Sequence, residues 1–195
     1  CALCIDTDIK DGEVIGDPTE AALYVLAEKG GVNVREFRNN NPRVASIPFD
    51  SDYKFMATFH NMKTGTGKPV IRAYVKGAPD VILERSTYGL MSDGSIRDLS
   101  ADDGKKIEDE NEIIAKEGLR VLALAQKDID LESFDPKADL MQYMQDLMMT
   151  ALIGEVDPPR AEAKEAIKKA KLAGVQVRMI TGDHAVTAEA IGREL

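Results

Sequence analysis

One stretch of the sequence gathers lysines, glycines and threonines in a composition typical of phosphate-binding loops. Residues 61–70 read NMKTGTGKPV. A P-loop requires GxxxxGK followed by Ser or Thr, because its backbone N–H groups hold phosphate and the hydroxyl binds magnesium. Met62 stands at the first glycine position of that motif, and Pro69 follows Lys68 in place of the hydroxyl. An aspartyl-phosphate motif needs a carboxylate immediately before Lys63, and Met62 supplies none. Both interpretations therefore fail.

A β-hairpin explains the same stretch. Strand patterns flank it at 54–61 and 69–77. Gly65 and Gly67 are expected to adopt the positive φ angles that a hairpin tip needs. The chemistry that the stretch resembles must lie elsewhere.

A lysine and a glycine at the end of the second strand could contact a nucleotide. Residues 74–80 read YVKGAPD, so that Lys76 ends the strand just before Gly77. A glycine has no side chain and allows a ligand to approach the backbone. A partly buried Lys76 would be a strong hydrogen-bond donor beside an adenine or a phosphate. A solvated lysine at a strand end explains the pattern equally well.

An aromatic residue at another strand end could stack on a base. Phe49 begins the string FDSDYKFM at 49–56. Stacking of a base on an aromatic ring contributes about 1–3 kcal/mol. From the residues alone, a plain core position for Phe49 is the better interpretation.

A third group of polar residues lies near the end of the chain. The string VRMITGD reads as a parallel strand that runs into a turn. Ligands of open α/β sheets gather at the carboxyl ends of the strands. The Thr181 hydroxyl, the Gly182 N–H and the Asp183 carboxylate would meet there, at the start of the next helix. Capping of that helix by Asp183 is an alternative role.

The overall composition is that of a soluble globular protein without nucleic acid as a partner. The formal net charge is −9, with 34 acidic and 25 basic residues, whereas nucleic-acid binders present basic faces. No apolar run approaches the roughly 18 residues that a membrane span needs. Both cysteines lie in CALC at residues 1–4, and the two histidines, His60 and His184, are far apart. We therefore expect no metal site and two small apolar cysteine side chains.

The predicted elements indicate an α+β fold. A helix at 16–30 has Asp17 or Thr19 as its cap, an apolar face at Leu23, Leu26 and Ala27, and a stop at Gly30. The other predicted elements are strands at 43–49, 54–61, 69–77 and 119–128, and helices at 78–86 and 100–118.

The strand at 119–128 is too apolar to have one wet face, so we place it centrally in an antiparallel sheet. In the helix at 100–118, Ile107, Ile113 and Ile114 form the expected inner face. Glycines and turn residues at 89–94 indicate a turn.

Beyond about residue 148 the pattern changes to alternating strands and helices. Strands are predicted at 149–157 and 175–183, each followed by a helix, which is typical of a parallel β/α unit. We therefore predict two domains, 1–148 with an antiparallel sheet and flanking helices, and 149–195 as part of a doubly wound α/β domain.

Several ordered strings together resemble the cytoplasmic part of P-type cation-transporting ATPases, and the calcium-pump-like group above all. The resemblance covers nearly the whole chain. The strings are GDPTEAAL at 16–23, FDSDYKFM at 49–56, YVKGAPD at 74–80, EGLRVLALA at 117–125, DPPR at 157–160 and MITGDHAVTAEAI at 179–191.

The resemblance implies a nucleotide-binding domain, followed by part of the haloacid-dehalogenase-like phosphorylation domain. It implies that Phe49 stacks on adenine, that Glu20 accepts a hydrogen bond from the adenine amino group, and that Arg120 reaches the phosphates. Ser51 departs from the pattern, because calcium-pump relatives often carry an arginine there. The nucleotide-binding residues implied are Glu20, Phe49, Lys54, Lys76, Gly77, Ala78 and Arg120.

The resemblance also implies what the phosphorylation-domain segment does. Thr181, Gly182 and Asp183 match residues that surround the transferred phosphoryl group. The family's phosphorylated aspartate lies in DKTGT and its magnesium-holding segment in GDGxND, and neither string occurs in this sequence. We therefore expect a fragment, on the cytoplasmic face of a membrane, that binds ATP or ADP and holds no catalytic residue.

In the full-length pump, ATP and Mg²⁺ would serve cation transport, with calcium as the expected ion. The partners would be the remaining phosphorylation, actuator and transmembrane domains. Because the α/β segment is incomplete, its open sheet edge is expected to favour self-association or looseness.

Two other classes of function stay open at this point. The string IDTD offers a D-x-D pair, Asp6 and Asp8, like that of stand-alone haloacid-dehalogenase-type phosphatases, although the preceding strand would be short. The other alternative is a non-catalytic interaction module with a vestigial nucleotide pocket.

Overall fold

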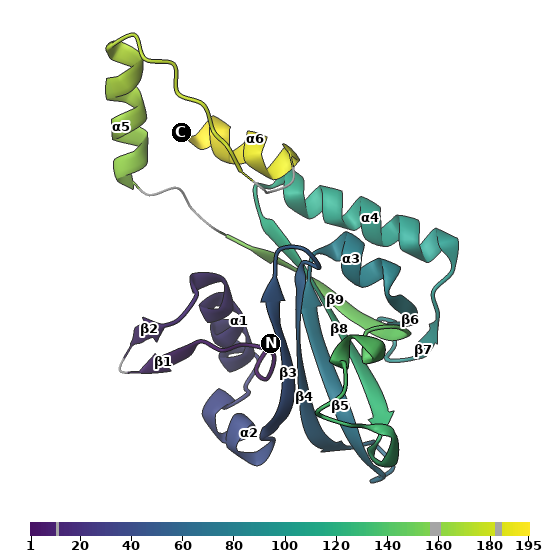
Figure 1. The fold of residues 1–195 in the computed structure, drawn as a ribbon. Helices are drawn as coiled ribbons and strands as arrows, with labels where there is room; N and C mark the ends of the chain where they lie inside the picture. Colours follow the sequence, from purple (N-terminus) through teal and green to yellow (C-terminus); the bar gives the residue numbers. More distant parts are fainter. Residues whose placement is uncertain (11, 157–160, 182–184) are drawn as a thin grey trace. The chain divides into compact units, whose positions relative to one another are not determined.

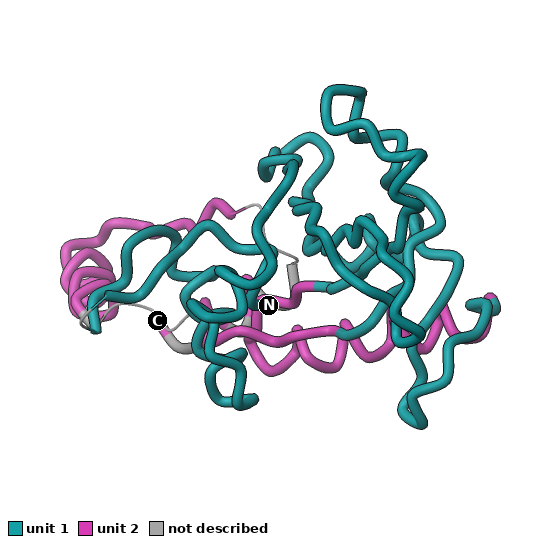
Figure 2. Tube along the Cα trace, turned by 90° about the horizontal axis from the view of Figure 1, so that it is seen from below, with its two compact units in different colours: residues 1–100, 123–151 teal, residues 101–122, 152–195 magenta. Residues whose placement is uncertain are grey.

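The computed structural model describes residues 1–10, 12–156, 161–181 and 185–195 (Figure 1). The chain divides into two compact units, which Figure 2 distinguishes by colour. The first contains residues 1–100 and 123–151, and the second contains residues 101–122 and 152–195.

A seven-stranded, mostly antiparallel sheet has the strand order β3-β4-β5-β8-β9-β6-β7. The pairs β3–β4, β4–β5, β5–β8 and β6–β7 are antiparallel, and β6–β9 is parallel. The α+β class is therefore confirmed, and β8 lies centrally as predicted. The strands are β3 (Arg43–Asp50), β4 (Phe55–Lys63), β5 (Pro69–Gly77), β6 (Ser86–Leu90), β7 (Ile96–Asp98), β8 (Arg120–Asp130) and β9 (Leu147–Glu155).

The hairpin of β4 and β5 confirms the structural interpretation of residues 61–70. The two strands pair without interruption from Phe55 opposite Gly77 to Lys63 opposite Pro69. At the tip, the N–H of Gly67 donates to the Thr64 carbonyl at 2.8 Å, and Gly67 has a φ of 85°. Gly65 has no positive φ, contrary to the prediction, because a turn followed by one left-handed residue is sufficient to reverse the chain.

Strand β4 is the centre of the core because both of its faces are covered. On one face the Thr58 hydroxyl donates to the Leu3 carbonyl at 3.4 Å, so the N-terminal segment packs there. On the other face the ring of Phe59 lies 5.3 Å from that of Phe134 and 6.1 Å from that of Tyr143. Residues 55–60 are consequently all buried.

Two helices and a small hairpin accompany the N-terminal segment (Figure 1). They are β1 (Asp8–Lys10), β2 (Glu13–Ile15), α1 (Pro18–Lys29) and α2 (Val34–Asn40). Asp17 caps α1 by accepting from the N–H groups of Thr19 and Glu20, as the sequence indicates. Leu23 and Ala27 are buried, but Leu26 is exposed, because the inward face of α1 runs along the i, i+4 row through Leu23.

The regions after β5 and after β8 contain a predicted helix and turn, together with a β6–β7 hairpin that the sequence pattern did not reveal. The predicted helix is α3 (Pro79–Glu84). Strands β6 and β7 form a hairpin around the turn expected at 89–94. Residues 131–146 contain two short 3-10 helices, η1 (Leu131–Ser133) and η2 (Leu140–Tyr143).

The second unit contains three helices among its described residues: α4 (Ala101–Lys116), α5 (Ala161–Leu172) and α6 (Ala185–Glu194). Helix α4 ends just before Gly118, whose φ of 79° stops it as predicted. Ala115 is buried but Ile113 is exposed, so Ile113 does not belong to the expected inner face. Within the described part of the chain, no helix is long and apolar enough to cross a membrane.

The prediction of a separate parallel strand at 175–183 is wrong for the residues that the structure describes. Residues 175–181 have no strand conformation, and the Ile180 side chain is 97% exposed. An isolated strand is unstable because its backbone groups need a neighbouring strand. The other predicted strand of the β/α unit, at 149–157, overlaps β9, which belongs to the seven-stranded sheet. The haloacid-dehalogenase-like segment and the boundary after residue 148 stay predictions.

Candidate functional site

A largely buried ion pair joins helix α1 to the end of strand β5. The Lys76 Nζ lies 2.6 Å from Oε1 of Glu20, and the two side chains are only 9% and 13% exposed. These residues are 56 positions apart in the sequence. Two residues that the family resemblance implies for nucleotide binding are therefore in direct contact.

The second oxygen of the Glu20 carboxylate is held by the N-terminal segment. The N–H groups of Asp6 and Thr7 donate to Oε2 at 2.7 and 2.9 Å, and the Thr7 hydroxyl lies 3.1 Å from the same atom. A carboxylate with three donors on one oxygen and an ammonium on the other has a fixed orientation. Thr7 has no counterpart among the residues predicted for the site.

The glycine of GDPTE is required by this packing. Gly16 has a φ of 130°, and a Cβ atom there would lie 2.3 Å from the Thr7 Oγ1 and 2.9 Å from its Cα. The N–H of Asp17 also donates to the Thr7 hydroxyl at 2.8 Å. The start of α1 and residue 7 therefore form one close-packed unit around the Glu20 carboxylate.

The environment of Glu20 favours its ionised form. Burial acts to raise the pKa of Glu20, but the hydrogen bond and charge of Lys76, together with the N–H groups of Asp6 and Thr7, lower it below its ordinary value. A hydrogen-bonded carboxylate of this kind can accept from a ligand donor only through the remaining lone pair of Oε1, or by replacing Lys76.

Gly77 has a different packing role from the one expected. A Cβ atom at Gly77 would lie 2.5 Å from the Lys54 carbonyl oxygen and 2.6 Å from the Phe55 Cβ. The Ala78 N–H donates to the same Lys54 carbonyl at 3.0 Å. The room left by the missing side chain is thus filled by the start of β4, and the contribution of Gly77 and Ala78 to nucleotide binding stays a prediction.

Lys54 lies in a tight turn with an uncommon backbone conformation. Its φ is 54°, one of two positive values among the described residues that are not glycine. Its N–H donates to the Asp50 carbonyl at 2.8 Å and its side chain is exposed. Positive φ costs free energy for a residue with a Cβ and often accompanies functional sites.

Phe49 is 64% exposed, so the core position favoured by the residues alone is wrong. The pairing of Asp50 with Phe55, and of Phe55 with Gly77, aligns the adjoining ends of three neighbouring strands. Phe49 and Lys76 therefore lie at the same end of the sheet. An exposed phenyl ring at this position offers a flat apolar surface to a ligand.

The remaining predicted site residues lie in the second unit. Arg120 is the first residue of β8 and is half-buried, and Thr181 is exposed. Gly182 and Asp183 lie outside the described residues. The structure therefore brings Glu20 and Lys76 into direct contact, and Lys76 lies at the same end of the sheet as Phe49 and the turn that carries Lys54.

The structure does not support the D-x-D alternative. Asp8 begins β1, which pairs antiparallel with β2 in a two-stranded sheet. Asp6 is bound by Arg43 at 2.6 Å, and Asp8 lies 3.7 Å from Arg35. The nucleophile of such phosphatases follows a parallel strand, and these carboxylates instead pair with arginines on the surface.

The cysteines have the environment of small packed side chains. Both are free, and Cys4 is buried, where its thiol donates to the Met56 carbonyl at 3.6 Å. Burial raises the pKa of the Cys4 thiol and keeps it protonated. The described residues contain no group of three His, Cys, Asp or Glu side chains that could hold a metal ion.

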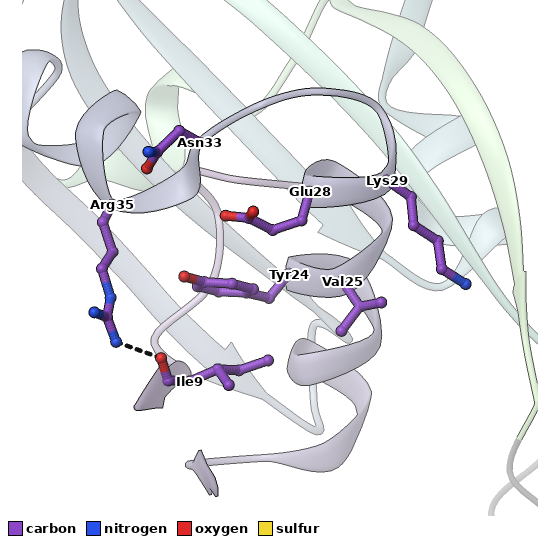
Figure 3. A pocket seen from close by; sticks show the side chains of 7 residues that line it. All are labelled: Ile9, Tyr24, Val25, Glu28, Lys29, Asn33 and Arg35. Carbon is purple, nitrogen blue, oxygen red and sulfur yellow. Dashed lines mark hydrogen bonds between the residues drawn. The ribbon is translucent and has the colours of Figure 1, made fainter. Parts of the chain in front are cut away.

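A surface hollow lies elsewhere in the first unit, between β1, α1 and the start of α2. Figure 3 shows the Arg35 side chain on one side of it, donating to the Ile9 carbonyl, and the Tyr24 ring between Arg35 and Val25. None of its residues belongs to the predicted site. The lining residues are Ile9, Tyr24, Val25, Glu28, Lys29, Asn33 and Arg35.

Comparison with known proteins places the chain in a family. The first unit is an α+β domain with a mostly antiparallel sheet and flanking helices, the class of fold that the resemblance implied. Residues 1–162 match the family model described as P-type ATPase, cytoplasmic domain N. The chain therefore belongs to the P-type ATPases.

Similar proteins are named as cation pumps. The cation-transporting ATPase pma1 of Synechocystis is 40% identical over 197 residues, and the calcium-transporting ATPase of Bacillus subtilis is 39% identical over 199 residues. The sodium/potassium exporting P-type ATPase cta3 of Schizosaccharomyces pombe is 38% identical over 206 residues.

These matches cover 99%, 100% and 100% of this chain, but 21%, 21% and 18% of the three relatives. The chain thus spans about a fifth of the length of the pumps that it resembles.

Proposed function

We propose that this chain is the ATP-holding part of a P-type cation pump that uses ATP hydrolysis to transport calcium. The single observation that carries the proposal is the exposed Phe49 ring at the same end of the sheet as the buried Glu20–Lys76 pair. An apolar plane at the same end of a sheet as a fixed carboxylate and an ammonium is complementary to a purine with an exocyclic amino group and phosphates. ADP would bind in the same way, since it shares the base.

The residues have separate roles in this proposal. Phe49 stacks on the adenine, and Glu20 accepts from its amino group. Lys76, Lys54 and Arg120 supply positive charge toward the ribose phosphates, which attract such groups strongly in a partly desolvated site. Gly77 and Ala78 contribute backbone at the strand end.

The phosphoryl transfer step belongs to a carboxylate outside this chain. We propose that Thr181, Gly182 and Asp183 surround the transferred phosphoryl group when the rest of the phosphorylation domain is present. Mg²⁺ would neutralise the developing charge on the phosphates. The described residues offer no cluster of acidic ligands for that ion, so no step through it is assigned to this chain.

In the whole pump, we propose residues 1–148 as the nucleotide-binding domain and residues 149–195 as part of the phosphorylation domain. Both would lie on the cytoplasmic face of the membrane, joined to the actuator and transmembrane domains. In isolation, the apolar side chains at 172–180 favour self-association, because a large part of their surface is exposed among the described residues. Sedimentation of the chain at rising concentration tests this, and a monomer throughout would contradict it.

Titration of the ¹⁵N-labelled chain with ATP tests the binding proposal. We expect the amide signals of Glu20, Phe49, Lys54 and residues 76–78 to shift, and no phosphate to be released. Phe49→Ala should weaken binding by about 1–3 kcal/mol, the stacking contribution of one base.

Phe37→Ala is the matched control, since it removes another exposed phenyl ring from the same unit, on α2. Its affinity for ATP should equal that of the wild type. Absence of shifts at millimolar ATP would sink the proposal and favour a non-catalytic interaction module.

A further inference from the structure

The N-terminal segment that orients Glu20 is itself held by an arginine of helix α2. The Arg38 guanidinium donates to three backbone carbonyls of this segment, those of Ala2 at 3.0 Å, Ile5 at 3.2 Å and Thr7 at 3.0 Å. Its Cζ lies 5.8 Å from the centre of the Tyr24 ring, on α1. One side chain therefore ties the segment to both helices.

Residues 5–7 form hydrogen bonds in two directions, through their carbonyls to arginines and through their N–H groups to the Glu20 carboxylate. Through its carbonyl, Thr7 is bound by Arg38, and through its N–H it binds the Glu20 carboxylate. The Ile5 carbonyl is bound by Arg38 and also by Arg43 of β3, at 3.0 Å. Residues 5–7 have no strand or helix of their own to fix their path, apart from these contacts and their packing.

We propose that Arg38 is a positioning residue of the nucleotide site, which acts on the Glu20 carboxylate through the backbone of residues 5–7. The inference rests on the proposed ATP-binding function only for its consequence on affinity. The geometric link from Arg38 to Thr7, and from Thr7 to Glu20, stands on the contacts themselves.

An arginine suits this role and a lysine does not. The planar guanidinium presents several N–H donors in a fixed arrangement, so that it serves carbonyls of residues 2, 5 and 7 at once. The ammonium of a lysine is a single point and cannot span these three acceptors. Arg38→Lys therefore preserves the charge and removes the positioning, which separates the two effects.

The first measurement needs no nucleotide. The side-chain carboxyl ¹³C signal of Glu20 is followed through a pH titration in the wild type, Arg38→Lys and Arg38→Met. Loss of the ordered N–H donors of Asp6 and Thr7 should raise the pKa of Glu20 in both variants. Arg35→Met is the matched control, because Arg35 lies on the same helix and contacts Asp8 and the Ile9 carbonyl instead.

An unchanged pKa of Glu20 in a folded Arg38→Lys variant would overturn the proposal. So would an equal rise in Arg35→Met, since it would show a general effect of charge on this helix. Retention of the fold is checked by the amide signals of β4 and β5. Should Arg38→Met fail to fold, Arg38→Lys carries the same measurement.

The second measurement is a double-mutant cycle on ATP affinity. Arg38→Lys should weaken ATP binding about tenfold, the effect of losing one hydrogen bond to a charged group. In a Glu20→Gln background the same substitution should have little further effect on ATP affinity. The carboxylate through which Arg38 acts on the ligand is already absent there. An equal loss in both backgrounds would refute positioning through Glu20.

The two measurements distinguish a failure of the proposed ATP-binding function from a failure of the positioning role of Arg38. If the wild type does not bind ATP, the proposed function fails, while the pKa of Glu20 still tests the positioning. If ATP binds but the pKa of Glu20 is the same in every variant, the positioning role fails alone.

Discussion

Replacement of Lys76 by methionine is the sharpest test of the buried ion pair. Lys76→Met keeps the aliphatic part of the side chain and removes the ammonium that lies 2.6 Å from Glu20. Because both side chains are at least 87% covered, solvent screens their interaction only weakly. Removal of one partner from a buried pair costs about 3–5 kcal/mol. Glu20 keeps three donors on its other oxygen, so we expect a loss near the lower end, about 3 kcal/mol.

The loss of stability caused by Lys76→Met should become smaller as the pH falls. In the wild type the pKa of Glu20 is lowered, so its contribution to stability is present above the ordinary glutamate range and is lost as the pH falls through the lowered value. In the variant, burial remains but the hydrogen bond and charge of Lys76 are gone, which raises the pKa of Glu20. The difference in stability should therefore narrow as the pH falls from 7 to about 4.

Urea unfolding of the wild type, Lys76→Met and Lys54→Met at several pH values provides the assay. Lys54→Met is the control, because that lysine is exposed and lies at the same end of the sheet. Unfolding is followed through the amide signals of core residues in the first unit. The chain has two units, and a signal from the whole chain could combine two transitions. A loss in Lys76→Met no greater than in Lys54→Met, or a loss that is the same at every pH, would refute the reasoning.

Three further substitutions test the surroundings of the site. Gly77→Ala should destabilise the chain by about 1–3 kcal/mol in urea unfolding, because its Cβ would meet backbone atoms of Lys54 and Phe55. Lys54→Gly should stabilise it by up to about 1 kcal/mol, through relief of the positive φ, while it weakens ATP binding in calorimetry. Burial lowers the pKa of His60, so the wild type should lose stability as the pH falls below about 6.5, whereas His60→Leu should lose less over that range. An unchanged free energy of unfolding in Gly77→Ala would contradict the first expectation, and a lower one in Lys54→Gly would contradict the second. Identical pH profiles of stability in the wild type and His60→Leu would contradict the third.

Much of the fold followed from local signals in the sequence. Helix α1 has a capping aspartate, an early proline and a final glycine, and each acts within a few residues. Strands β4 and β5 are runs rich in apolar residues on the two sides of a glycine-rich tip. The apolar composition of β8 correctly indicated its central place. The hairpins β1–β2 and β6–β7 were missed because strands of three to five residues carry little periodicity.

The segment at 175–180 shows the limit of a purely local signal. Its apolar and β-branched residues favour a strand, yet in the structure it has no strand neighbour among the described residues and stays exposed. Strand formation depends on hydrogen bonds to another segment, so composition alone cannot produce it.

By itself the sequence determined the family, through ordered strings that run from GDPTE to TGD, and with it the candidate roles of Glu20, Phe49 and Lys76. It also ruled out the glycine-rich stretch at 61–70 as a phosphate loop, since Met62 and Pro69 lack the required groups.

Only the tertiary structure decided that Phe49 is exposed, that Glu20 and Lys76 form a buried pair, and that Gly77 makes room for β4. It alone revealed Thr7 and Arg38, because their contacts to Glu20 and its segment use backbone N–H and carbonyl groups. Every residue type other than proline carries those two groups, so the path of the chain, and not the identity of the side chains, determines where they bind.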